Sequence, residues 1–152
     1  MFTVSDMMTP HPHTLTASHT LADAKRLMAK HHIHHVPITD KDNQLIGLVS
    51  QRDVLAAQES SLEQISKSTF ISALDIPLEQ TMHRNLRSVD PTAGLKQAAL
   101  YMQKHQIGCL PIVDHNKLVG IITDTDFVSI AINLLELQEE VEPIENDSTS
   151  TF

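Results

Sequence analysis

The stretch GLVSQRD, residues 47–53, returns as GIITDTD at residues 120–126, which lies 73 positions later in the chain. Each copy follows a short apolar run centred on proline, HVPI at 35–38 and LPIV at 110–113. Self-similarity at a fixed spacing indicates a duplicated structural unit. We therefore expect two copies of one fold, each ending in the pattern G-h-h-[ST]-x-x-D, where h is an apolar residue.

The correspondence continues upstream of this pattern with an offset of 74 residues. The residues that match in type at this offset are Met8, Leu21, Ala24, Met28, Lys30, His31, Ile33, Pro37, Ile38 and Asp40. The offset then falls to 73, because the polar turn KDNQ of the first copy corresponds to HNK in the second. Folds tolerate a deletion most easily in such a turn, which supports a common fold for both copies.

Within each copy, apolar residues first recur at helical spacing and then form two short runs rich in branched residues, separated by a polar turn. This pattern predicts helix, strand, strand, helix, with a strand hairpin in the middle. A short extended segment precedes each first helix, at 14–16 and 88–90. The predicted fold class is α+β, with mixed helices and strands, and each half is small enough that we expect both to share one core.

The expected division of the chain follows from the repeat. Repeat 1 covers residues 4–57, a mostly polar and partly helical connecting segment covers 58–77, and repeat 2 covers 78–135. Residues 136–152 form an acidic tail, for which we expect a solvated end without fixed structure.

Composition excludes several classes of function. The net charge of −8 and the absence of a basic stripe argue against nucleic-acid binding. No apolar run approaches the ~20 residues that span a bilayer, and the single cysteine, Cys109, cannot form an internal disulfide, so we expect a protein of the reducing cytoplasm that does not bind membranes. There is no recognisable Ser-His-Asp order and no glycine-rich phosphate loop, which predicts that the protein is not an enzyme.

The helix, the proline-centred strand, the hairpin and the closing G-h-h-[ST]-x-x-D together resemble the cystathionine-beta-synthase (CBS) domain, in tandem as a Bateman module. The resemblance covers residues 4–135 and is to stand-alone bacterial CBS-pair proteins of the acetoin-utilisation-like kind. It implies two repeats packed about a pseudo-two-fold axis, with two clefts that bind adenine nucleotides (AMP, ADP or ATP) or adenosyl ligands. It also implies a ligand-sensing regulatory module without an obligatory cofactor, a homodimer, and an unknown regulated protein partner.

The same resemblance implies the residues of each cleft. It places Ser50 with Asp53 in one cleft and Thr123 with Asp126 in the other, where the carboxylate holds the ribose hydroxyls. A carboxylate suits this role because it can accept from two vicinal hydroxyls at once. The other implied ligand-binding positions are Val36, Pro37, Leu110 and Pro111 around the base, His34 and His35 against phosphate, and Thr14 and Ser88 as secondary polar contacts.

The two copies differ at the positions that would contact phosphate. His34 and His35 of the first copy correspond to Gly108 and Cys109 in the second. We therefore expect unequal clefts, with the histidines beside Ser50 and Asp53.

Three alternatives remain. The Ser or Thr and the Asp of each motif are also residues that cap helices and close turns, and the paired repeats would then serve as a ligand-free dimerisation or protein-interaction module. The histidine run at 31–35 invites a metal site, but successive strand residues point to opposite faces, so we predict no metal. The same run could instead respond to pH, because histidine ordinarily titrates near about 6.5.

Overall fold

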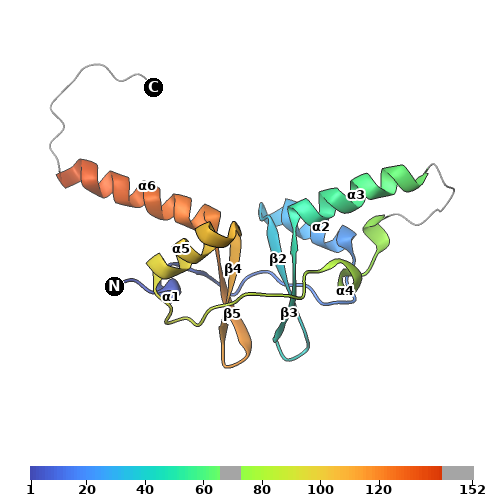
Figure 1. The fold of residues 1–152 in the computed structure, drawn as a ribbon, viewed down its shortest axis with the longest axis horizontal. Coiled ribbons are helices and arrows are strands. Elements are labelled where there is room, and N and C mark those ends of the chain that lie inside the picture. The colour runs from blue at the N-terminus through green and yellow to red at the C-terminus, as the bar shows by residue number, and fades with distance from the viewer. Residues whose placement is uncertain (66–72, 142–152) are drawn as a thin grey trace, which may run out of the picture.

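The computed structural model describes residues 1–65 and 73–141, which form two similar halves side by side (Figure 1). The elements in chain order are α1 (Val4–Met7), β1 (Thr9–Pro10), α2 (Leu21–His31), β2 (His35–Thr39), β3 (Leu45–Ser50), α3 (Gln51–Ile65), the 3₁₀ helix η1 (Ala73–Asp75), α4 (Leu78–Thr81), α5 (Leu95–His105), β4 (Cys109–Asp114), β5 (Lys117–Thr123) and α6 (Asp124–Val141). The predicted order of helix, strand, strand, helix is confirmed in both halves, and the mixed fold class with it.

The first helix of each repeat forms where the apolar spacing predicts it. In α2 the residues Leu21, Ala24 and Met28 are buried along one face. Thr20 caps this helix, since its hydroxyl accepts from the Asp23 N–H at 3.3 Å. The C-terminal cap of this helix is His32, which has a left-handed φ of 54°, and Gln106 after α5 has the same φ.

The second helix of each repeat extends past the boundary that the sequence assigns to the repeat. Helix α3 continues to Ile65, into the connecting segment that we expect to be partly helical, and α6 continues to Val141 through residues expected to be unstructured. Glutamate and leucine are good helix formers, so the acidic sequence extends α6 once the helix has started. The remainder of the acidic tail lies outside the described residues.

The hairpins of the two repeats lie next to each other. Strand β2 pairs with β3, and β4 pairs with β5, both antiparallel. Across the two turns, the Leu118 N–H donates to the Asn43 carbonyl, and the Asn43 side-chain amide donates to the Leu118 carbonyl, both at 3.0 Å. The repeats are thus joined at the tips of their hairpins, at the lower edge of Figure 1.

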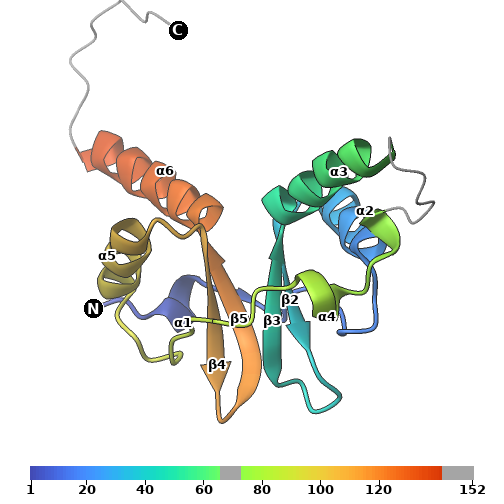
Figure 2. The ribbon, with the colours of Figure 1, turned by 45° about the vertical axis from the view of Figure 1, so that its right-hand side comes forward.

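Each half of the molecule contains a short leading segment from the start of the other repeat. Strand β1 pairs with β5, and α1 lies beside the second half, whereas α4 lies beside the first, as Figures 1 and 2 both show. The Val4 N–H donates to the Ala93 carbonyl at 2.8 Å, and at the equivalent place the Leu78 N–H donates to the His19 carbonyl at 2.7 Å. The two leading segments are therefore exchanged about an approximate two-fold axis.

This exchange corrects the expectation of one shared core. There are two cores, one in each half, and Leu78 and Met82 complete the first while Val4 belongs to the second. Small repeats bury too little surface alone, and here the shortfall is met by exchanging segments rather than by merging cores.

The exchange also explains the glycine of the repeated motif. A Cβ added to Gly47 would lie 2.2 Å from the sulfur of Met82, and one added to Gly120 would lie 2.3 Å from that of Met8. Both methionines come from the exchanged segments. Glycine is thus the residue that lets these segments cross their strands closely.

Candidate functional site

The ends of the two repeated motifs form helix caps. Ser50 precedes α3, and its hydroxyl accepts from the Asp53 N–H at 3.2 Å. In return the Ser50 N–H and hydroxyl donate to Asp53 Oδ2 at 2.7 and 2.9 Å. This reciprocal arrangement is a capping box, in which the third helical residue reaches back to the cap.

The second motif has the same geometry. The Thr123 N–H donates to Asp126 Oδ2 at 2.9 Å, and the Asp126 N–H donates to the Thr123 hydroxyl at 3.4 Å. The capping interpretation of the motif is therefore correct for both copies. It leaves the second carboxylate oxygen, Oδ1, directed to other partners.

The partners of Oδ1 come from the exchanged segments. The Nε2–H of His83 donates to Asp53 Oδ1 at 2.8 Å, and the Thr9 hydroxyl donates to Asp126 Oδ1 at 3.3 Å. Thr9 and His83 are equivalent at the offset of 74 residues. Burial raises the pKa of Asp53, but hydrogen bonds from Ser50 and His83 outweigh it and hold that pKa below its ordinary value.

Each capping box borders a cavity between the repeats. The first cleft, next to the Ser50 box, has a volume of about 280 Å³, and the second cleft, next to the Thr123 box, has about 330 Å³. The residues lining the first cleft include Ser50, His83, Asn85, Arg87, Ile107, Gly108, Cys109 and Pro111. Those lining the second include Thr9, His11, His13, His32, His34, His35, Thr123 and Asp126.

The composition of the cavities corrects part of the predicted grouping of residues. His34 lines the second cleft with Thr123 and Asp126, and it also lines a third cavity, described below, together with Ser50. Gly108 and Cys109 line the first cleft with Ser50. His35 borders both clefts. The reason is that the segment entering each hairpin faces the other repeat, so it lines the cavity beside the other repeat's capping box.

Several predicted positions do not reach the clefts. Val36 and Leu110 have no exposed surface and pack in the two cores, so their side chains cannot enclose a base as predicted. Both prolines, Pro37 and Pro111, are fully buried, although Pro111 is also among the residues that line the first cleft. Thr14 and Ser88 line neither of these two clefts.

Other lining residues were missed by the sequence analysis. They are Thr9, His11 and His13 in the second cleft, and His83, Asn85 and Arg87 in the first. All of them lie at the start of a repeat, ahead of its first long helix, α2 or α5. The offset of 74 pairs Thr9 with His83 and His13 with Arg87, which is the one signal that links them.

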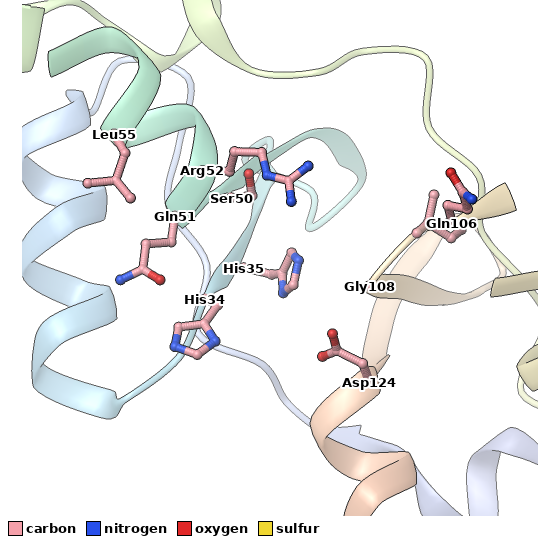
Figure 3. A pocket seen from close by; sticks show the side chains of 10 residues that line it. His34, His35, Ser50, Gln51, Arg52, Leu55, Gln106, Gly108 and Asp124 are labelled. Carbon is pink, nitrogen blue, oxygen red and sulfur yellow. The ribbon is translucent and has the colours of Figure 1, made fainter. Parts of the chain in front are cut away.

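A third cavity of about 670 Å³, the central pocket, lies between the first turns of α3 and α6 (Figure 3). His35 and Gln51 face it from the first repeat, and Gly108 and Asp124 face it from the second. Burial lowers the pKa of His35, although the carboxylates of Asp124 and Asp53 oppose this effect.

Within the described part of the chain, no group of three or more histidine, cysteine, aspartate and glutamate side chains is arranged to hold a metal ion. No helix in residues 1–65 and 73–141 is both long enough and apolar enough to cross a membrane.

The fold and the clefts define a class of protein, namely paired α/β repeats with exchanged leading segments and a ligand-sized cavity beside each capping box. The sequence profile described as the CBS domain matches residues 4–60 and 75–133, and the chain therefore belongs to the CBS-domain family. The CBS domain-containing protein YhcV of Bacillus subtilis is 32% identical over 133 residues, which cover 88% of this chain and 86% of that protein.

Similar solved structures support the same assignment. A candidate acetoin utilization protein, AcuB, from Vibrio cholerae is 60% identical, with a TM-score of 0.79 over 94% of this chain and 99% of that one. CBSX2 in complex with AMP is 29% identical, with a TM-score of 0.74 over 89% and 99%. The CBS domain pair of protein MJ0100, in complex with 5′-methylthioadenosine and S-adenosyl-L-methionine, is 25% identical, with a TM-score of 0.74 over 88% and 98%.

Some relatives are enzymes, but they match over a small part of their length. Homoserine O-acetyltransferase of Methanococcus vannielii is 30% identical over 118 residues, which are 76% of this chain and 22% of that enzyme. The chain thus spans about a fifth of such curated relatives.

Proposed function

We propose that this protein is a ligand-sensing regulatory module that binds an adenosine-containing nucleotide, or a related adenosyl compound, in the clefts between its repeats. The observation that carries the proposal is that each cleft joins capping-box residues of one repeat to polar side chains of the other. These residues are Ser50 in the first cleft and Thr123 with Asp126 in the second. Similar CBS pairs hold AMP, 5′-methylthioadenosine and S-adenosyl-L-methionine.

The chemistry of the capping boxes suits a ribose. Asp53 Oδ2 and Asp126 Oδ2 are used by the caps, but a carboxylate offers about four acceptor positions in total. The side chain of Asp53 remains 20% exposed. A ribose hydroxyl can therefore donate to Oδ1 beside the hydrogen bond from His83 or Thr9, and such charge-assisted bonds are stronger than neutral ones.

A ligand in either cleft would touch both repeats, which gives it a route to regulation. A ligand shifts an equilibrium only between states that it binds unequally. Because each cleft is walled by two repeats, any change in their relative position alters the cleft, and occupancy in turn favours one position. We propose that a protein partner responds to this change.

We also propose that the protein is a homodimer. The alternative function, a ligand-free dimerisation or protein-interaction module, is compatible with the same dimer. Val128, Ile132 and Leu135 follow at helical spacing on α6 and are 58%, 50% and 58% exposed. Sedimentation velocity on the wild type and on Ile132→Glu tests this, with a dimer expected for the first and a monomer for the second. We place the protein in the cytoplasm, a proposal that rests on its single cysteine.

The ligand proposal is tested by calorimetric titration with AMP, ADP, ATP and S-adenosylmethionine. At least one should bind to the wild type, and Asp53→Asn or Asp126→Asn should weaken binding at its own cleft. Because both changes also damage a helix cap, the matched control is Asp23→Asn. Asp23 completes the capping box of α2 with Thr20, away from the clefts. The proposal fails if no compound binds, or if Asp23→Asn weakens binding as much as the cleft variants do.

A further inference from the structure

Equivalent positions of the two clefts carry cations of different kinds. His13 lines the second cleft and Arg87 the first, and the two are separated by the repeat offset of 74 residues. Each rests on the end of a helix: His13 stacks on His31, with ring centroids 3.7 Å apart and planes at 16°. Arg87 lies 3.3 Å from the imidazole of His105, the counterpart of His31, and donates to the Tyr101 hydroxyl at 2.6 Å.

The second cleft is lined mostly by imidazoles. Two of its histidines come from the segment after β1, two from the segment between α2 and β2, and one from the start of β2: His11, His13, His32, His34 and His35. His31 and Lys30 stand behind them at the end of α2. Facing them from the start of α6 are the carboxylates Asp124 and Asp126. With neutral imidazoles, the lining of this cleft is therefore negative, and it becomes positive as the histidines gain protons.

The first cleft lacks most of these titrating groups. Asn85 stands at the position of His11, Gln106 at that of His32, and Gly108 at that of His34. Gln51 replaces Asp124 at the start of the following helix. The cleft keeps Arg87, which is charged at every physiological pH, together with His35 and His83. His83 is already paired with Asp53.

We infer that the two clefts hold the anionic part of a ligand by different means: Arg87 gives the first cleft a fixed positive charge, whereas the second becomes positive only as its histidines protonate. The inference rests on the proposed function, and names the ligand class of the second cleft as a phosphorylated adenosine compound. Because histidine ordinarily titrates near about 6.5, the affinity of the second cleft for phosphate rises between pH 8 and pH 6. That of the first cleft changes much less.

The electrostatics of the second cleft agree with proton uptake on binding. Burial lowers the pKa of His31, and repulsion from His13, Lys30 and His32 lowers it further. A bound phosphate would offset this repulsion, so the histidines would take up protons as the ligand enters. By linkage, each proton taken up raises the affinity by up to about tenfold per unit fall in pH.

The experiment is calorimetric titration of the whole protein with AMP at pH 6 and pH 8, in two buffers that differ in ionisation enthalpy. The Asp126→Asn variant shows which binding event belongs to the second cleft, because it should weaken that event. We expect its AMP affinity to rise about tenfold or more at pH 6 with net proton uptake. Adenosine, which lacks phosphate, should show no such change.

The phosphate of AMP itself titrates near about pH 6, so the decisive control exchanges the two cations. His13→Arg gives the second cleft a fixed positive charge and should weaken its pH dependence, while four histidines still line that cleft. Arg87→His should introduce a pH dependence in the first cleft. Ligand and buffer are the same for each variant and the wild type, so the titration of AMP itself cancels in the comparison. Thermal unfolding of both variants verifies that they fold.

The possible outcomes separate the two proposals. The inference is overturned if the AMP affinity of both clefts depends equally on pH, or if His13→Arg leaves the pH dependence of the second cleft unchanged. In either case, AMP binding itself still supports the proposed function. Absence of binding by AMP, adenosine and the other adenosyl compounds at either pH overturns the proposed function, and the inference with it.

Discussion

Replacing Gly47 with alanine tests the exchange of segments between the repeats. The added Cβ would lie 2.2, 2.7 and 3.0 Å from the Sδ, Cγ and Cβ of Met82. The sulfur can swing aside, but the Cβ of Met82 moves only if the backbone after α4 moves. Overpacking of this kind costs about 1–3 kcal/mol, and the backbone contact puts Gly47→Ala in the upper part of that range, at about 2–3 kcal/mol. Gly120→Ala should cost less, about 1 kcal/mol, because only the Sδ, Cγ and Cε of Met8 lie close, at 2.3, 3.0 and 3.1 Å.

Urea unfolding followed by far-ultraviolet circular dichroism measures these differences, since the chain has no tryptophan and one tyrosine. In a thermal scan, about 2–3 kcal/mol corresponds to a fall of about 4–12 °C in Tm for a chain of this size. A double-mutant cycle then locates the cause. In a Met82→Ala background, Gly47→Ala should cost clearly less, because the Sδ and Cγ contacts are gone and only the Cβ contact at 3.0 Å remains. In a Met8→Ala background it should keep its full cost.

The reasoning is refuted if Gly47→Ala costs the same with and without the Met82 side chain. That outcome would mean that the segment after α4 does not cross strand β3 of the first repeat in solution.

Other predictions follow from the same contacts. Thr123→Ala removes the cap of α6 and should cost about 1 kcal/mol in urea unfolding, with Thr123→Ser retaining most of the stability; an unchanged midpoint for the alanine variant would contradict the capping role. Burial lowers the folded-state pKa of His35 despite the nearby carboxylates, so the unfolded chain binds more protons near pH 6 and stability should fall from about pH 7 to pH 5. His35→Gln should flatten this dependence, and an identical slope in both proteins would exclude it. Burial also raises the pKa of the Cys109 thiol, so Ellman's reagent should react with it slowly in the native protein and quickly in urea; equal rates would show that the thiol is accessible.

The sequence predicted the elements of each repeat because local signals determine them. The buried face of α2 and the polar turns of the hairpins are visible as spacing in one stretch of chain. The length of α6 was underestimated, since the acidic composition suggested an unstructured tail where helix-forming residues continue a helix that is already capped.

The cleft composition was harder to predict, because it depends on contacts between distant segments. Sequence placed His34 beside the capping box of its own repeat, but did not predict that it also lines the second cleft beside Asp126 of the other repeat. Nothing local indicates that α1 and β1 complete the second half. The offset that pairs Thr9 with His83 shows their equivalence, but not the side of the molecule on which either lies.

The exchange of leading segments also constrains the order in which the protein can fold during synthesis. A ribosome that has released the first hairpin and α3 has not yet supplied Leu78 and Met82, so the first core is incomplete until the chain extends past α4. The second core combines Val4 with Ile122 of β5, so it is complete only after β5 has also been made. The two cores are therefore completed one after the other, and neither forms from one repeat alone. Since each half depends on residues of the other repeat, we expect neither repeat to fold when it is expressed separately.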